Sequence, residues 1–487
     1  MRLFTRVLFS SLIIFAFVST ILAQQSAQQT SAAVDEVFAD YAVPNSPGCA
    51  LAIARDGKLI YAKGYGSANL EQSSPITPDS VFDIGSTSKQ FSAASILLLE
   101  KQGKLSINDD VRKYIPELPD YGKKITILNL LNHTSGLRDY LTLFELSGVN
   151  VDSVTTDDEA LALVVRQKEL DFDPGSEWLY SNTGFFLLSV IVKRVSGQTL
   201  REFAAENIFH PLGMSQTLYR DSHTLLVPNR ALAYDPVKKS SSFTLNVSYF
   251  EQTGDGAVHT TVGDLLKWDE NFYSAQVGGK PFLAELQTEG VLTNGKIVGY
   301  AKGLSISHYR GLPTVRHGGS WGGYRAELLR FPEQHFSVVC LCNRSDASPE
   351  DRADRVADIY LSSLLKPKEP KKEDTEEQPR RPEISVPTGD LEKLTGLYWS
   401  DELAVAYRFD LVKGKLTLTH LLYSGGMPRS SDMQGSALVP VAVDVFDMPD
   451  NGLSFHFQRD VSGSASSFTL DAGRSKGMIF KRTSGNL

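Results

Sequence analysis

Cysteine is scarce in this sequence, and none of it has a metal-binding pattern. Only three cysteines, Cys49, Cys340 and Cys342, occur in 487 residues. None stands in a spacing typical of metal sites, so we expect no metal and no cofactor. Cys340 and Cys342 lie two apart on a predicted strand, which hinders a bond between them. Three buried free thiols are the favoured interpretation, and pairing of Cys49 with either of the others is the alternative in an oxidising compartment.

A basic segment is also missing. The chain has 49 Lys and Arg against 57 Asp and Glu, which gives a formal net charge of -8. Because nucleic-acid-binding proteins use clustered positive charge, nucleic acid is excluded as a partner. The remaining composition, 41% hydrophobic and 22% charged, is that of an ordinary globular protein. The length exceeds one typical core and predicts a large domain with a smaller one.

Long apolar runs are absent except at the N-terminus. Residues 7–21 are apolar, Arg2 and Arg6 stand before them, and Ala23 offers a cleavage point. This arrangement predicts a signal peptide over residues 1–23 and export to the periplasm or beyond, with an uncleaved anchor as the alternative. No cysteine follows for lipid attachment, and no later segment reaches transmembrane length. We therefore expect no stable membrane span after cleavage.

Shifts in composition divide the rest of the chain. Residues 34–365 mix helical and strand patterns and start with a hairpin over 48–62 that turns at Asp56-Gly57. Residues 366–389 are charged and rich in proline, which predicts an extended linker. Residues 390–487 alternate in short runs between glycine turns, which predicts a small all-β barrel or sandwich. We find no internal repeat.

Periodicity within these regions predicts further elements. Helices are expected from residue 86 onward and over 127–132, 158–165, 185–195, 200–208 and 351–365. Strands are expected over 303–308, 314–317, 324–331, 337–343, 404–411, 415–422, 437–443, 453–457 and 466–470.

A serine and a lysine at the first of these helices are the first candidates for chemistry. Gly85 is followed by Ser86 and, three residues on, by Lys89. Residues three apart share one face of a helix. N–H groups at a helix start favour an oxyanion near the serine, and a desolvated amine can take the hydroxyl proton. Ser86 is thus a candidate nucleophile and Lys89 a candidate base; a serine cap beside a solvated lysine is the ordinary alternative.

Two later segments offer partners for Ser86. Tyr180 and Asn182 place a phenol and an amide on one side of an extended segment, and a phenol near two cations can act as a base. A core tyrosine beside a capping asparagine is the alternative.

The second segment is glycine-rich. Gly318 and Gly319 follow the predicted strand residue His317, so a substrate backbone can approach closely. The N–H of Ser320 is then a candidate oxyanion donor beside that of Ser86. A glycine-rich hairpin turn is the alternative.

Together these motifs carry a family resemblance. Ser86-x-x-Lys89, Tyr180-x-Asn182 and His317-Gly318-Gly319 resemble, in order and separation, the three active-site motifs of the serine β-lactamase and penicillin-binding-protein superfamily. The Tyr-x-Asn form is similar to the class C β-lactamase, D,D-peptidase and esterase branch. Residues 48–57 and 133–137 match further hallmarks of that branch, and the resemblance covers about residues 34–365.

The resemblance implies a mixed α/β (α+β) fold. An antiparallel sheet built from both ends of residues 34–365 would be flanked by helices, with an all-α region inserted between. Residues 390–487 resemble the lipocalin-like barrel of some peptidases in this family. Such a barrel could cover the cleft, restrict substrate size or mediate assembly.

The resemblance also implies acyl-enzyme chemistry. Ser86 would attack a carbonyl, Lys89 and Tyr180 would share the proton transfers, and Asn182 would orient the substrate amide. The amides of Ser86 and Ser320 would hold the oxyanion, and water would release the acyl group. His133, in the 133–137 motif, is expected to fix a turn rather than act as a base.

One position departs from the commonest family pattern. Lysine most often stands where this chain has His317. Histidine is cationic only part of the time near neutral pH, so we expect weak β-lactamase activity. Arg316 and Arg325 could supply charge, but strand alternation puts Arg316 on the opposite face. Family members with histidine here tend to be esterases or peptidases acting on D-residue peptides.

The sequence therefore predicts an exported serine hydrolase acting on an ester or amide, such as a D-amino-acid peptide or a small ester. A β-lactamase or D,D-carboxypeptidase is the alternative enzyme. A sensor or scaffold that is acylated without turnover, with the barrel as its binding module, is the non-enzyme alternative. The expected partner is a small-molecule or peptide substrate, and an oligomer is left open.

Overall fold

The computed structural model describes residues 28–43, 45–149, 153–368, 381–423, 428–429 and 433–483. The predicted signal peptide and residues 369–380 of the predicted linker lie outside the described residues. Within the described part of the chain, no helix is both long and apolar enough to cross a membrane.

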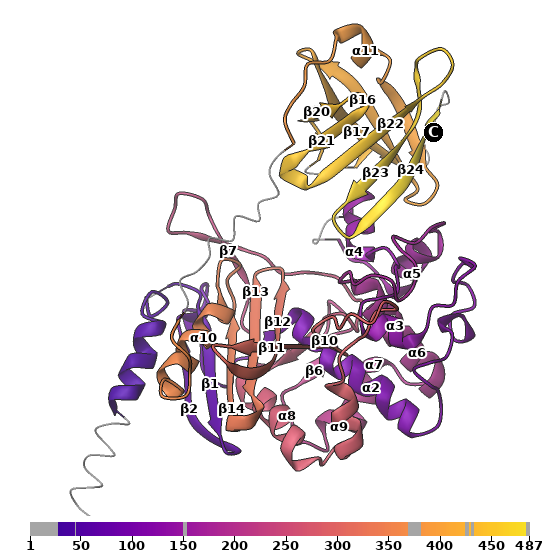
Figure 1. Cartoon of the computed structure of the whole chain (residues 1–487). Helices are drawn as coiled ribbons and strands as arrows, with labels where there is room; N and C mark the ends of the chain where they lie inside the picture. The colour runs from indigo at the N-terminus through magenta and orange to yellow at the C-terminus, as the bar shows by residue number, and fades with distance from the viewer. Residues whose placement is uncertain are drawn as a thin grey trace, which may run out of the picture.

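One antiparallel sheet organises the larger part of the chain (Figure 1). Its strand order is β10-β11-β12-β13-β14-β1-β2, so strands from both ends of this part meet at the β14-β1 pair. Asp56 and Gly57 turn the first hairpin with φ of 52° and 70°, as predicted, because these residues tolerate left-handed backbone. The strands are β1 Cys49–Arg55, β2 Lys58–Tyr65, β10 Tyr300–Ala301, β11 Leu304–Tyr309, β12 Leu312–Trp321, β13 Tyr324–Phe331 and β14 Phe336–Cys342.

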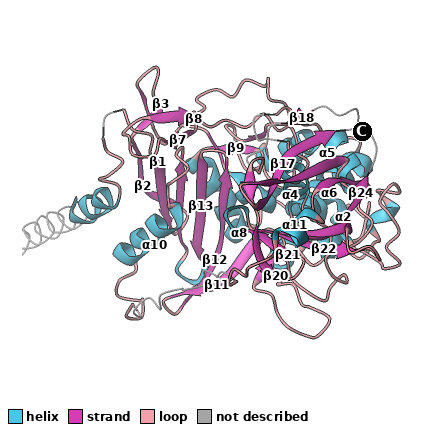
Figure 2. Ribbon diagram, turned by 90° about the horizontal axis from the view of Figure 1, so that it is seen from above, coloured by secondary structure: helices cyan, strands magenta, loops and turns pink. Residues whose placement is uncertain are grey.

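Both faces of the central strands of this sheet, β13, β14 and β1, are buried. On one face, α10 and a helix over residues 28–37 cover a core that includes Leu51 and Val338. On the other, α8 packs on β1 and β14 over a larger core that includes Ala50 and Val339. Figure 2 shows α10 and α8 on opposite sides of the strands. Successive residues of β1 and β14 therefore serve different cores, as the alternation of a strand requires.

The predicted helices are present, with boundaries shifted by a few residues, whereas the helices over 140–146, 280–286 and 388–392 were not predicted. Thr126, Thr156 and Thr199 each close a capping box at the start of a helix, which satisfies N–H groups that have no partner within the helix. The helix over 200–208 is split into α7 and a π-turn, η3 Ala205–Phe209. The helices are α2 Lys89–Lys101, α3 Ile127–Leu131, α4 Tyr140–Leu146, α5 Asp157–Val165, α6 Asn182–Ser196, α7 Leu200–Ala204, α8 Val262–Ser274, α9 Lys280–Leu286, α10 Pro349–Tyr360 and α11 Thr388–Glu392.

Short elements connect these parts. The 3-10 turns are η1 Gly85–Ser88, η2 Val111–Lys113, η4 Pro332–Gln334 and η5 Pro449–Asn451. The short strands are β3 Ser67–Asn69, β4 Ser74–Pro75, β5 Phe82–Asp83, β6 Leu218–Tyr219, β7 Tyr234–Pro236, β8 Phe243–Leu245 and β9 Val258–Thr260.

The C-terminal barrel, residues 396–483, is a second antiparallel sheet that curls until it nearly closes (Figure 1). Its order is β18-β17-β16-β15-β24-β23-β22-β21-β20, with β19 paired to β17. The predicted strands appear as β16, β17, β20, β22 and β23, but β15, β18, β21 and β24 were missed. Gly477 and exposed polar residues interrupt the alternation in β24. The strands are β15 Gly396–Ser400, β16 Val405–Val412, β17 Lys415–Tyr423, β18 Pro428–Arg429, β19 Ser436–Ala437, β20 Val439–Ala442, β21 Val445–Met448, β22 Leu453–Arg459, β23 Ala465–Ala472 and β24 Ser475–Thr483.

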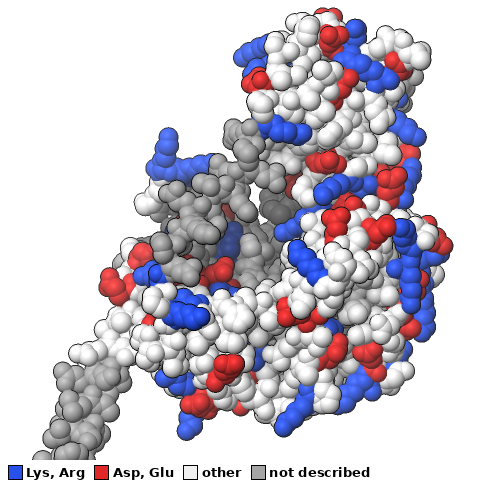
Figure 3. All heavy atoms as spheres, viewed as in Figure 1, with Lys and Arg blue, Asp and Glu red and all other residues white. Residues whose placement is uncertain are grey.

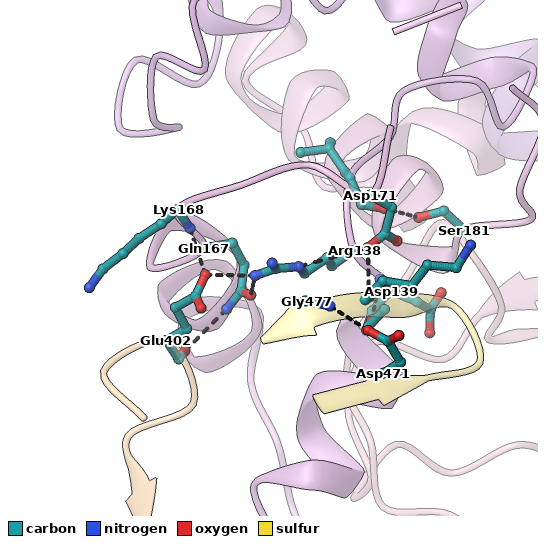
Figure 4. A network of polar contacts seen from close by, with 12 residues as sticks. Arg138, Asp139, Gln167, Lys168, Asp171, Ser181, Glu402, Asp471 and Gly477 are labelled. Carbon is teal, nitrogen blue, oxygen red and sulfur yellow. Dashed lines mark hydrogen bonds and ion pairs between the residues drawn. The ribbon is translucent and has the colours of Figure 1, made fainter. Parts of the chain in front are cut away.

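A buried ion pair joins the barrel to the helical region (Figure 4). Arg138 Nη1 lies 2.6 Å from Glu402 Oε1, and the two side chains are 1% and 3% exposed. Gln167 Oε1 accepts a second hydrogen bond from Arg138, and the Lys168 N–H donates to Glu402. Charges taken out of water need such partners. The barrel is therefore fixed against the loop that follows the predicted 133–137 motif.

The cysteines differ from the favoured interpretation. Cys49 and Cys342 form a disulfide, and only Cys340 stays a free, buried thiol. The two bonded residues face each other directly across the antiparallel β1 and β14 strands. The sequence left this pairing as the alternative because it could not tell which strands are neighbours.

The Arg138–Glu402 pair predicts that substituting Glu402 lowers the stability more than substituting its neighbour Asp401. Glu402→Ala leaves a buried guanidinium without its partner, and we expect it to cost about 3–5 kcal/mol of stability. Asp401→Ala removes two exposed contacts, with Lys168 Nζ at 3.2 Å and with Trp399 Nε1 at 2.9 Å, and should cost less than about 1 kcal/mol. Urea unfolding of both variants measures the difference. Equal losses would contradict the assignment of the pair as the barrel's anchor.

Candidate active site

Ser86 stands out in an otherwise buried stretch. Every residue from 81 to 99 is buried except Ser86, which is half-exposed. Gly85 precedes it with φ of 48° and begins η1, so Ser86 lies in a 3-10 turn just before α2 rather than in the first turn of the α-helix as predicted. The predicted proximity still holds, because Lys89 Nζ lies 3.1 Å from Ser86 Oγ.

The Lys89 amino group is fully buried and has three partners. Its Nζ is 3.1 Å from Ser86 Oγ, 2.9 Å from Asn182 Oδ1 and 2.7 Å from the backbone oxygen of Asp255. Asn182 Oδ1 and the Asp255 carbonyl can only accept hydrogen bonds. The third position on nitrogen therefore points at the serine, where the group donates as an ammonium or accepts the hydroxyl proton as an amine. This is the geometry that a serine–lysine proton transfer requires.

The second predicted segment reaches the same place. Asn182 is the first residue of α6, and its N–H donates to Asp139 Oδ2 at 2.6 Å. The Tyr180 ring lies with its centre 4.9 Å from Lys89 Nζ. The Tyr180 hydroxyl is buried and has no hydrogen-bond partner among the described residues. Since buried polar atoms are normally paired, this hydroxyl is ready to bond a substrate.

His133 has the structural role that the sequence predicts. Its Nδ1 accepts from the Ser181 N–H at 3.1 Å, and its ring stacks 4.2 Å from the ring of Tyr180. Burial, followed by the charges of Lys89 and other nearby cations, lowers the pKa of His133 well below its usual value. A neutral ring that accepts at Nδ1 holds the chain of Tyr180 in place.

The glycines of β12 allow this strand to lie directly against η1. A Cβ atom on Gly319 would stand 1.9 Å from the Ile84 oxygen, and one on Gly85 would stand 2.7 Å from the Ser320 nitrogen. Thr87 Oγ1 also donates to the His317 oxygen at 3.1 Å. The backbones that carry the N–H groups of Ser86 and Ser320 are therefore neighbours, as an oxyanion hole needs. Strand β12 continues through this segment to Trp321, four residues beyond the predicted end.

His317 is not the part-time cation that the sequence suggested. Its Nδ1 lies 2.6 Å from the Gly318 oxygen, so it donates there, and its Nε2 accepts from the Tyr300 hydroxyl at 3.0 Å. Burial, with Lys89 adding to it, lowers the pKa of His317 to about 4. The ring is thus neutral near pH 7. Arg316 lies on the other face, as predicted, and is paired with Glu327.

One cavity joins these groups. It has a volume of about 1140 Å³ and is lined by Ser86, Tyr180, Asn182 and all four residues 317–320. Lys89 lies behind this wall. Figure 3 shows the surface hollowed between the sheet side, the helical side and the barrel.

Three residues of the site were missed from the sequence. Asp255 holds Lys89 through a backbone carbonyl, which any residue type could provide. Tyr300 fixes His317 and belongs to a two-residue strand. Arg474, in the turn between β23 and β24, lines the cavity from the barrel. No local sequence pattern indicates the roles of these three residues, because segments far apart in the sequence must pack together to bring them to the site.

Comparison with known proteins identifies the family of the chain. Residues 34–361 match the sequence profile of the family described as Beta-lactamase. The match spans most of the chain, includes every predicted site residue and stops before the barrel. The chain therefore belongs to the beta-lactamase family of serine hydrolases.

Named relatives refine this placement. The chain is 31% identical over 315 residues to "Penicillin-binding protein 4*" of Bacillus subtilis (strain 168), which covers 62% of this chain and 69% of that protein. It is 26% identical over 377 residues to a D-aminopeptidase of Gluconobacter oxydans (strain 621H), covering 77% and 67%. Against a D-aminopeptidase of Brucella anthropi it is 26% identical over 305 residues, which is 62% of this chain and only 57% of that protein.

Solved structures share the fold. The octameric penicillin-binding protein homologue from Pyrococcus abyssi matches with a TM-score of 0.60 and 23% identity, over 93% of this chain and 99% of that one. The D-amino acid amidase from Ochrobactrum anthropi SV3 matches with a TM-score of 0.59 and 22% identity, over 69% and 99%. The first match is long enough to include the barrel as well as the sheet.

The close packing of η1 and β12 predicts that Gly85 is needed for activity. Gly85→Ala would push its methyl group onto the Ser320 nitrogen and displace the candidate oxyanion donor, so kcat/KM should fall by at least about 100-fold. Gly103→Ala is the matched control, because Gly103 also has positive φ, 70°, but nothing within 4 Å of the added atom. Hydrolysis of an aryl ester measures both. An active Gly85→Ala enzyme would contradict the assignment.

Asp255 predicts a pH dependence of stability. Its carboxyl is buried and bonded to Tyr140, and burial raises its pKa to about 7, with Lys89 opposing this rise. The native state therefore holds a proton that the unfolded chain has lost between about pH 4 and pH 7, and stability falls as pH rises through this range. The slope contributed is at most about 1.4 kcal/mol per pH unit.

Asp255→Asn removes this titration and keeps the backbone carbonyl. Its stability relative to the wild type should thus increase from pH 4.5 to pH 7.5, as measured by urea unfolding. Asp79→Asn, at an exposed position, is the control and should show a constant difference. A constant difference for Asp255→Asn as well would refute the argument.

Proposed function

We propose that this protein hydrolyses amides or esters of D-amino acids through an acyl-enzyme on Ser86. One observation carries the proposal: a buried amine, Lys89, contacts both Ser86 Oγ and Asn182 Oδ1 behind a cavity wall. D-Amino-acid substrates are favoured because relatives of this chain carry the names D-aminopeptidase and D-amino acid amidase.

The proposed reaction follows from the hydrogen bonds. Ser86 Oγ attacks the substrate carbonyl carbon while Lys89 takes its proton, and the N–H groups of Ser86 and Ser320 bond the oxyanion. Asn182 bonds the acyl amide. The Tyr180 hydroxyl, which faces the same cavity, passes a proton to the leaving nitrogen as the carbon–nitrogen bond breaks. Lys89 then returns its proton to Tyr180. Water attacks the ester carbonyl and gives a proton to Lys89, which passes it to Ser86 Oγ as the acid leaves.

β-Lactamase activity is less well supported. A permanent cation at position 317 would attract the carboxylate of a β-lactam, whereas the burial of His317 lowers its pKa to about 4 and keeps the ring neutral. We therefore expect poor turnover of cephalosporins.

Export remains part of the proposal. It rests on the basic and apolar pattern of residues 1–23 and agrees with the disulfide between Cys49 and Cys342, since such bonds persist in oxidising compartments. N-terminal sequencing of the protein from its native compartment should begin at Gln24; an intact Met1 there would refute cleavage.

A panel of four substrates tests the reaction: an aryl ester, a D-alanyl anilide, a D-Ala-D-Ala peptide and a chromogenic cephalosporin. The wild type should turn over the ester and at least one D-amino-acid substrate, with the cephalosporin slowest. Ser86→Ala should abolish turnover, with a loss of at least about 1000-fold. Activity that survives Ser86→Ala refutes the nucleophile, and stoichiometric acylation without turnover would favour a sensor.

A further inference from the structure

The turn between β23 and β24 brings a cation of the barrel into the candidate active site. Arg474 lines the same cavity as Ser86, and its Cζ lies 4.9 Å from the centre of the Tyr180 ring. Lys89 Nζ lies at the same distance from that ring. Tyr180 is therefore contacted by one buried amino group from its own region and by one exposed guanidinium from the barrel.

The position of this turn is fixed by hydrogen bonds to the active-site loop. The Asp139 N–H lies 3.2 Å from the Arg474 oxygen and 3.1 Å from Ser475 Oγ. The Lys476 N–H donates to Asp171 Oδ1 at 2.7 Å. The same Asp139 accepts the Asn182 N–H on its carboxylate. One residue thus connects the turn to the start of α6, and Figure 4 shows Asp139 and Asp171 beside the β23-β24 turn.

The charge of Arg474 is not neutralised locally. The carboxylates near the turn are engaged elsewhere: Asp139 bonds Asn182 and Thr142, Asp171 bonds the Lys476 N–H, and Asp471 bonds the Gly477 N–H. No carboxylate among the described residues pairs with the Arg474 guanidinium. With His317 neutral and Lys89 bonded on all sides, Arg474 is an uncompensated positive charge beside Tyr180.

We propose that Arg474 binds a carboxylate on the leaving part of the substrate, so that the barrel selects peptides with a free C-terminal carboxylate. The inference rests on the proposed function, in which Tyr180 gives a proton to the leaving nitrogen. The group attached to that nitrogen lies on the Tyr180 side of the cavity, within the region that Arg474 lines. A guanidinium bonds a carboxylate with two parallel N–H donors.

Two substrates that differ only in this charge test the proposal. They are N-acetyl-D-Ala-D-Ala and its C-terminal amide, assayed with the full chain. Arg474→Ala should lower kcat/KM for the acid by roughly 10- to 100-fold and leave the amide within about 3-fold, mainly through KM. Arg474→Lys should retain part of the preference. Lys476→Ala, an exposed cation of the same turn, is the matched control and should change neither substrate.

Other results would overturn the proposal. Equal losses for acid and amide in Arg474→Ala would mean that the residue only supports Tyr180. Unchanged kcat/KM for both substrates in Arg474→Ala would mean that the carboxylate is bound elsewhere, and loss of all turnover in Ser86→Ala would show that the proposed function still holds. No turnover of any substrate by the wild type would refute both. Melting temperatures matched to Lys476→Ala exclude unfolding as the cause, and Arg474→Gln replaces Arg474→Ala if that variant does not fold.

Discussion

A primary amine buried away from water must have every hydrogen bonded, and this requirement shapes the centre of the protein. Lys89 Nζ meets it by donating to Asn182 Oδ1 at the start of α6 and to the Asp255 backbone oxygen, and it shares a third hydrogen bond with Ser86 Oγ in η1. Losing any of them would leave a buried polar group unpaired, which costs more than an ordinary hydrogen bond contributes. The sheet, the helical region and the loop before β9 are therefore held in one relative arrangement.

Residues around the partners of Lys89 are fixed by hydrogen bonds in the same way. Asn182 can hold Lys89 only if its own backbone is fixed, and the carboxylate of Asp139 fixes it. The Asp139 N–H is in turn bonded to the barrel turn, and the neighbouring Arg138 forms the buried pair with Glu402. Two consecutive residues thus join the site to the barrel. The docked barrel is part of the support of the site rather than a separate attachment.

Sequence alone could predict what is local and repetitive. The spacing of Ser86 and Lys89 predicts that they share a face, and two residues suffice to predict the Asp56-Gly57 turn. The glycines of β12 indicate that another part of the chain or a substrate lies close to this strand. The charge of His317 was misjudged, because burial that depends on Tyr300 and Lys89 lowers its pKa to about 4. Asp255 acts through its backbone carbonyl, and Arg474 reaches the site because the barrel packs against the helical region. Neither role has a recognisable pattern in the neighbouring sequence.

The neutral state of His317 and the position of Arg474 affect how the protein would select its substrate. A lysine at position 317 would place a fixed charge on the strand that also carries the oxyanion donor. Substitutions there that change the recognition of a charged substrate would then also disturb acyl transfer. Here that position is a neutral, hydrogen-bonded ring, and a cation with no carboxylate partner among the described residues, Arg474, stands on a hairpin turn of another sheet. The two tasks are mechanically linked through Asp139, which bonds both the barrel turn and Asn182, and through Tyr180, which Arg474 contacts. Substitutions in this turn can therefore change the preferred substrate. The geometry around Ser86 and Lys89 stays the same, because the buried amine still needs its hydrogen-bond partners.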